Sequence, residues 1–265
     1  MRAFRSELIR IRRPAFLLGG IGLMALFAGI VSVFIFTSAE SAPAAPPQAG
    51  QGPGAYTVAE IASEGGFLTA LPTVSTLAGV ILLALWAIAV ATDYSTGLIR
   101  ILAQAHPNRT SLLGGKIAAL GVFTLLATTV TTLVVVLFAR PLAKLEGIPI
   151  EAWKTDFASE LGKGFFDFTI AGLVWGLIGL MLAVLTRSSA IAIGIGLGFL
   201  LVAEGLISIV APNASSYLPG GTLDTLAAGG NDQLAWGAAL GLVVLYGVIA
   251  ATVSLAAFRT RDIIS

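Results

Sequence analysis

The sequence predicts an all-α integral membrane protein that crosses the bilayer six times. Of its 265 residues, 57% are hydrophobic and only 11% are charged, whereas a soluble domain carries about 25% charged residues. The mean hydropathy is +0.94. A hydrocarbon core about 30 Å thick needs about 20 apolar residues in a helix. Six such runs are predicted as spans of one domain covering 1–265, at 15–36, 67–91, 117–139, 169–186, 189–211 and 234–258.

The segment ahead of the first span predicts an amphipathic helix. Between Arg2 and Arg13, the apolar residues Phe4, Leu8 and Ile11 follow helical spacing with arginines among them, which is typical of a helix in the headgroup region. Pro14 favours a break before the spanning helix. The alternative is a basic tail that only sets orientation. The apolar run that follows exceeds a signal-peptide core, so we expect an uncleaved first span.

Two connections carry further predictions. The segment 37–66 contains SAPAAPPQAGQGPGA, which is too poor in bulky apolar residues to fold, so we expect a flexible external loop. Before the fourth span, Ile150, Trp153 and Phe157 are spaced to share one face of an interfacial helix, with Trp153 as a headgroup anchor. Asp167 interrupts the apolar run there and leaves the start of the fourth span the least defined.

Glu204 lies deep inside the predicted fifth span. A carboxylate at that depth costs a few kcal/mol, so we expect it to face the bundle interior, a wet cavity or a polar partner. One interpretation is a role in transport, and the other is a protonated group that is hydrogen-bonded to a neighbouring helix.

Glycines recur at helical spacing in the last three spans. Small residues on one face let helices approach closely in lipid, and the pattern suits packing within one bundle as well as a subunit interface. These glycines are Gly172, Gly176 and Gly179 in the fourth span, Gly194 and Gly198 in the fifth, and Gly237 and Gly241 in the sixth.

The basic residues predict that both termini are cytoplasmic. In that orientation 11 of the 15 Lys and Arg residues lie in inner segments and four in outer ones, as the positive-inside rule requires. The inner residues are Arg2, Arg5, Arg10, Arg12, Arg13, Arg100, Arg109, Lys116, Arg187, Arg259 and Arg261. The outer residues are Arg140, Lys144, Lys154 and Lys163.

No motif in the chain indicates catalysis. The sequence has no Cys and one His, which excludes thiolate metal sites and Cys nucleophiles. A P-loop is absent because Thr110 stands where its first Gly belongs ahead of Gly115 and Lys116. No hydrolase motif and no basic nucleic-acid-binding domain is present. We therefore expect a protein that is not catalytic alone and holds no metal or cofactor, so any energy source lies on another protein.

The polar segment 92–116, TDYSTGLIRILAQAHPNRTSLLGGK, is the largest inner surface, and its motifs carry a resemblance. The chain resembles, over nearly its full length, the permease subunit of a bacterial type-2 ABC exporter. RSELIRIRRPAFLL is similar to the elbow helix of that family, and LTRSSAIAIGIGLGF to its tight inner turn between the fourth and fifth spans. The polar segment is similar to the family's loop after the second span, which holds a cytoplasmic coupling helix. Its matching positions are Asp93, where the family usually has Glu, and Gly97, Arg100, Pro107, Arg109 and Lys116.

The resemblance implies a bacterial inner-membrane subunit that exports a hydrophobic or amphiphilic small molecule, such as a drug, antibiotic or lipid. Its implied partners are a cytoplasmic ATP-binding-cassette subunit, which would hold ATP and Mg, a second permease copy or paralogue, and membrane lipid. Two alternatives stay open. The chain could be a secondary transporter or channel that works alone, or a structural subunit of a membrane complex. As a further alternative, the polar segment could be a solvated connector whose basic residues only enforce topology.

Overall fold

The structure is a computed structural model that describes residues 2–11, 14–39, 56–98, 101 and 109–260. Every regular element in these ranges is a helix. Six helical stretches are long and apolar enough to cross a membrane, which confirms the predicted number and makes this a multi-pass membrane protein. They are Phe16–Thr37, Gly66–Ser95, Thr110–Leu145, Phe157–Thr186, Ser189–Val210 and Trp236–Thr260.

The long helices are joined by short helical segments. In chain order the elements are α1 (Arg2–Ile11), α2 (Pro14–Thr37), α3 (Val58–Ala62), η1 (Gly66–Leu68), α4 (Leu71–Ser95), α6 (Arg109–Leu145), η2 (Glu151–Lys154), α7 (Phe157–Thr186), α8 (Ser189–Gly198), η3 (Phe199–Glu204), α9 (Gly205–Val210), α10 (Pro212–Ser215), α11 (Pro219–Ala227) and α12 (Trp236–Thr260). Within this set η3 is a π-helix.

Two of the long helices begin ahead of the predicted spans, and each extension contains a buried charged residue with a partner. α6 includes Lys116, whose ammonium contacts two carboxylates. α7 begins at Phe157 and includes Asp167, which is buried and accepts a hydrogen bond from Trp236 Nε1. Each partner offsets part of the desolvation cost of burying the charged residue. Without a partner, that cost would favour a span boundary at this position.

α4 and α7 form the centre of the bundle, and glycines bring them together. A Cβ at Gly176 would lie 2.4 Å from the Trp86 ring, and one at Gly179 would lie 2.2 Å from the Leu83 carbonyl oxygen. Trp86 Nε1 in turn donates to Thr124 on α6 at 3.0 Å. The glycine face of the fourth span therefore packs within the bundle.

The glycines of the last two long helical stretches differ from those of α7. A Cβ at Gly194, Gly198, Gly237 or Gly241 would meet no atom within 4 Å. Only 17% of the most apolar stretch within 189–210 is buried, against 61% within α7. These helices lie at the periphery, and the four glycines face no partner among the described residues of this chain.

The prediction that Trp153 is a headgroup anchor was wrong. Its side chain is only 2% exposed, and its Nε1 donates to the Ile61 carbonyl oxygen at 2.8 Å. It packs edge-on against Phe36 and beside Phe67. The segment from α3 to η1 folds over this indole, and the sequence spacing gives no sign of that cover.

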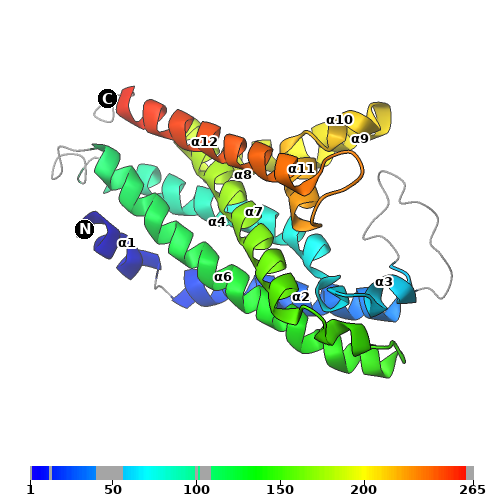
Figure 1. Cartoon of the computed structure of the whole chain (residues 1–265). Coiled ribbons are helices and arrows are strands. Elements are labelled where there is room, and N and C mark those ends of the chain that lie inside the picture. The colour runs from blue at the N-terminus through cyan, green and yellow to red at the C-terminus, as the bar shows by residue number, and fades with distance from the viewer. Residues whose placement is uncertain (1, 12–13, 40–55, 99–100, 102–108, 261–265) are drawn as a thin grey trace.

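The bundle has two distinct ends (Figure 1). α1, the start of α6 and the last turns of α12 lie at one end, which we call the α1 end. α3 and the last turns of α6 lie at the other, which we call the α3 end. α4 joins the two, because it begins near α3 and finishes near α1.

Candidate functional site

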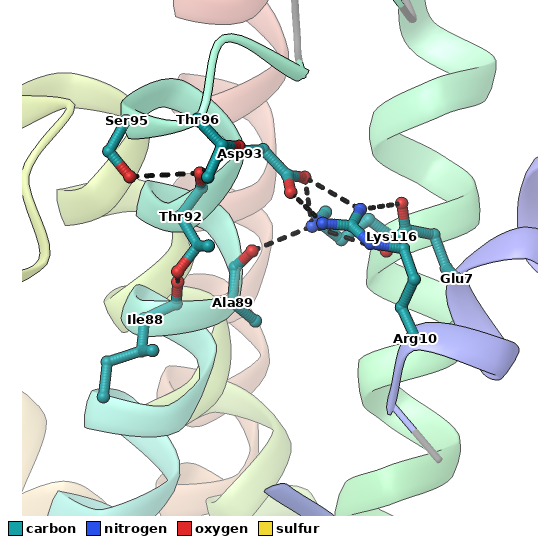
Figure 2. Close-up of polar contacts among 9 residues, drawn as sticks. All are labelled: Glu7, Arg10, Ile88, Ala89, Thr92, Asp93, Ser95, Thr96 and Lys116. Carbon is teal, nitrogen blue, oxygen red and sulfur yellow. Dashed lines mark hydrogen bonds and ion pairs between the residues drawn. The ribbon is translucent and has the colours of Figure 1, made fainter. Parts of the chain in front are cut away.

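Four ionisable side chains from three helices meet at the α1 end (Figure 2). Asp93 lies in the last turn of α4, Lys116 lies near the start of α6, and Glu7 and Arg10 lie on α1. Lys116 Nζ is 2.5 Å from Asp93 Oδ2 and 3.4 Å from Glu7 Oε2. Arg10 donates to Glu7 Oε1 at 2.9 Å and reaches both carboxylate oxygens of Asp93. We call these four residues the ionic cluster.

Three of the four residues of the ionic cluster are buried, Arg10 is half-buried, and the charges balance. Asp93, Lys116 and Glu7 are 3%, 7% and 8% exposed. Two acids face two bases, so each buried charge has an opposite charge beside it, without which burial would cost several kcal/mol. The hydrogen bond to Asp93 raises the pKa of Arg10 above its usual value, with burial acting in the opposite direction. The fork of Arg10 suits two-point contact with a carboxylate.

The local sequence explains why these groups face one another. Glu7 and Arg10 are three residues apart, so they share one face of α1. Asp93 lies at a helix C-terminus, where the helix dipole disfavours an acid, and the two cations offset this. Lys116 also donates to the carbonyl oxygen of Ala89, one turn before Asp93, at 2.9 Å. Lys116 thus contacts α4 at two points, the Asp93 side chain and the Ala89 backbone carbonyl.

Gly97 has a clear backbone role directly after the cluster. Its φ of 68° lies in the left-handed region, which favours glycine, and its N–H donates to the Tyr94 carbonyl oxygen at 3.2 Å. The hydroxyls of Thr92, Ser95 and Thr96 bond to carbonyl oxygens of the same helix end. α4 therefore ends at a defined point, immediately before the segment predicted to hold the coupling helix.

The sequence-predicted site residues divide into three groups. Asp93 and Lys116 come together in the ionic cluster, where burial keeps both side chains from the surface. Arg109 begins α6, and Arg100 and Pro107 lie outside the described residues. The coupling helix predicted between the second and third spans falls largely outside them as well. Sequence reasoning did not select Glu7 and Arg10 for the site, although their acid–base spacing on an amphipathic segment was a usable signal.

The turn between α7 and α8 lies at the same end of the bundle. Arg187 adopts a left-handed φ of 56° after α7, and Ser188 caps α8 by accepting from the Ile191 N–H at 3.4 Å. The guanidinium carbon of Arg187 is 5.9 Å from the centre of the Tyr94 ring, which follows Asp93 on α4. This contact is in the range of a cation–π interaction and links the turn to the end of α4.

Glu204 is part of a separate polar contact. Its carboxylate accepts hydrogen bonds from the N–H groups of Gly220 at 2.8 Å and Gly221 at 3.2 Å, in the first turn of α11. Free N–H groups and the helix dipole make a helix start a favourable place for a carboxylate. A Cβ at Gly220 would lie 2.2 Å from Glu204 Oε2, so the approach requires glycine there. The sequence-predicted polar partner of Glu204 is therefore a backbone rather than a side chain.

Asp224 on the same short helix is half-buried. Thr76 Oγ1 donates to its carboxylate at 2.8 Å, which links α11 to α4. Burial raises the pKa of Asp224 to about 6, with the Thr76 hydrogen bond opposing the shift and the charge of Glu204 adding to it. Among the described residues, no three His, Asp or Glu side chains converge as metal ligands.

Family models and curated proteins supply no relative from which a function could be carried over. No family model matches the chain, and no curated protein matches it.

Proposed function

We propose that this chain is the membrane-spanning subunit of an ATP-driven exporter. A separate cytoplasmic ATP-binding-cassette subunit would supply the energy, and a second copy or paralogue of the chain would complete the path. The observation that carries the proposal is the ionic cluster, which ties α1, α4 and α6 together beside the segment predicted to receive the ATPase. The cargo class, a hydrophobic or amphiphilic small molecule, rests on the sequence resemblance alone.

The cluster suits a mechanical role because it joins both helices that flank the coupling segment. Asp93 lies in the last turn of α4 and Lys116 lies two turns into α6, so a force on the chain between them reaches both helices. Separating buried, paired charges is costly, so the helix ends move as one unit rather than slide past each other. A conformational change in the ATPase can shift such a unit only if its contacts differ between the two states.

The proposed setting is a bacterial cell membrane with both termini in the cytoplasm. The support is the predicted excess of Lys and Arg on one side of the spans. In that orientation the α1 end faces the cytoplasm, where ATP is available. Asp93 and Lys116 then act from inside the bundle, and the ATPase contacts the segment between them through residues such as Arg100 and Arg109.

The proposal is tested by purifying the full chain from its native membrane and identifying what accompanies it. We expect an ATPase that co-purifies and an ATP-dependent transport of an amphiphilic probe in vesicles. Arg100→Glu or Arg109→Glu should uncouple ATP hydrolysis from transport while membrane insertion stays normal, and Lys144→Glu, on the opposite end of α6, is the matched control. Transport without any ATPase would instead indicate a secondary transporter, and an inert complex a structural subunit; either result overturns the proposal.

A further inference from the structure

A cavity of about 760 Å³ opens at the α3 end, far from the ionic cluster. Its walls come from α3, η1, the first turns of α4 and α7, the end of α11 with Ala228 and Gly229, and Trp236 at the start of α12. This volume is in the range of small-molecule sites, which are about 300–1,000 Å³. Tyr56 and Trp236 supply aromatic surface to the wall.

The lining is acidic. Glu60, Glu64, Glu160 and Asp167 line the cavity, and Lys163 is the basic residue that lines it. Lys163 is already engaged, because its Nζ lies 2.8 Å from Glu160 Oε1. The formal charge of the lining is therefore about −3 when all five groups are ionised.

Asp167 is the buried anchor of this surface. It is 3% exposed, and both of its oxygens accept from the Trp236 indole N–H, at 2.9 and 3.1 Å. Within the described part of the chain, no Lys, Arg or His forms an ion pair with it. A carboxylate can accept about four hydrogen bonds, and a buried one normally has a cation beside it. Among the described residues, Asp167 therefore has no counter-charge, and it lies on the wall of an open cavity.

We propose that this cavity binds an organic cation that carries an aromatic or apolar portion. Asp167 would attract the positive charge, and the faces of Trp236 and Tyr56 would add cation–π and apolar contact. A metal ion fits less well, because no three acidic side chains among the described residues come close enough to ligate one. The site goes beyond the proposed exporter function, since binding at the α3 end requires neither an ATPase nor a transport cycle.

The test uses the full-length protein in nanodiscs of neutral lipid and a matched pair of probes. Tetraphenylphosphonium and tetraphenylborate have nearly the same size and shape and opposite charge. Equilibrium dialysis against protein-free nanodiscs corrects for partition into lipid. We expect saturable binding of the phosphonium, weaker at high salt, and at least about tenfold weaker binding of the borate.

Variants locate the site. Asp167→Asn should weaken phosphonium binding about tenfold, because it removes the buried charge. Asp232→Asn removes one acid from an exposed position outside the cavity and should leave the affinity unchanged. If Asp167→Asn does not fold, Glu64→Gln at an exposed lining position should still weaken binding about twofold to threefold.

Equal affinity for the two probes, or equal effects of the substitutions inside and outside the cavity, would overturn the site. Because the readout is binding to this chain alone, such a failure leaves the exporter proposal standing. Conversely, a purification that lacks an ATPase leaves the cation site standing.

Discussion

Lys116 Nζ lies 2.5 Å from Asp93 Oδ2, and this ion pair fixes the start of α6 against the end of α4. The same ammonium contacts Glu7, so α1 is held by the same group. The chain between the two paired residues is 22 residues long. Any movement imposed on that segment acts on two helix ends that are already joined, whichever protein imposes it.

Replacing Lys116 should destabilise the protein, because the two buried acids then have less positive charge beside them. In Lys116→Met, Asp93 and Glu7 share Arg10 as their remaining cation, and we expect a loss of about 3–5 kcal/mol of stability. The measurement is the apparent melting temperature of the purified protein, followed by tryptophan fluorescence. Lys144→Met is the control, because Lys144 is exposed on the same helix.

A double variant distinguishes the energy of the Asp93–Lys116 ion pair from the effect of each substitution on packing. Asp93→Asn combined with Lys116→Met should cost less than the sum of the two single changes, because neither buried charge is then left alone. A loss from Lys116→Met no larger than that from Lys144→Met would contradict the stabilising role of the cluster.

Gly179→Ala should weaken the contact between α4 and α7. Its Cβ would lie 2.2 Å from the Leu83 carbonyl oxygen, and backbone cannot rotate away as a side chain can. We expect a loss of about 1–3 kcal/mol, read as a lower melting temperature. Gly194→Ala is the control, because its Cβ meets open space and alanine favours the helix by about 0.5–1 kcal/mol. Similar melting temperatures for the two variants would contradict this packing.

Glu204→Ala should loosen the first turn of α11. The N–H groups of Gly220 and Gly221 would lose their acceptor, which costs about 1–2 kcal/mol at a helix start. Amide hydrogen exchange at these two glycines should accelerate by roughly 5–30-fold. Glu204→Gln keeps one acceptor oxygen and should fall between. Unchanged exchange in the Ala variant would remove Glu204 as the cap of α11.

Asp224 should make the protein less stable as pH rises from about 4 to about 6. Its pKa is about 6 in the folded protein and 3.8 for the ordinary side chain, so in this window the folded state binds more protons than the unfolded state. Stability is then fully present near pH 4, falls by at most about 3 kcal/mol, and levels off above pH 6. Asp224→Asn should flatten that part of the melting profile, and an unaltered slope in this variant would contradict the assignment.

The number of spans could be predicted because length and apolarity are properties of a single segment. The starts of the long helices α6 and α7 could not, because Lys116 and Asp167 depend on partners far along the chain. Lys116 contacts Glu7, and Asp167 contacts Trp236, 69 residues away. Hydropathy scores each charged residue alone, so it marks both as helix boundaries, although both lie inside helices.

The candidate site could likewise be predicted only in part. Motif order selected Asp93 and Lys116, and their spacing gave no sign that α1 covers them with Glu7 and Arg10. Glu204 was expected to find a polar partner, but that partner is a pair of backbone N–H groups. Backbone donors have no signature in the sequence except Gly220, whose missing side chain leaves room for the carboxylate.

In the π-helical run Phe199–Glu204, the number of residues decides where the Glu204 side chain points. A π turn takes up one more residue than an α turn, and each residue of an α-helix rotates its successors by about 100°. Deleting one residue ahead of Glu204 would restore an ordinary helix and swing the carboxylate away from Gly220. A single-codon deletion in this run would therefore disconnect α11, 16 residues downstream, even though the Glu204 side chain itself is kept.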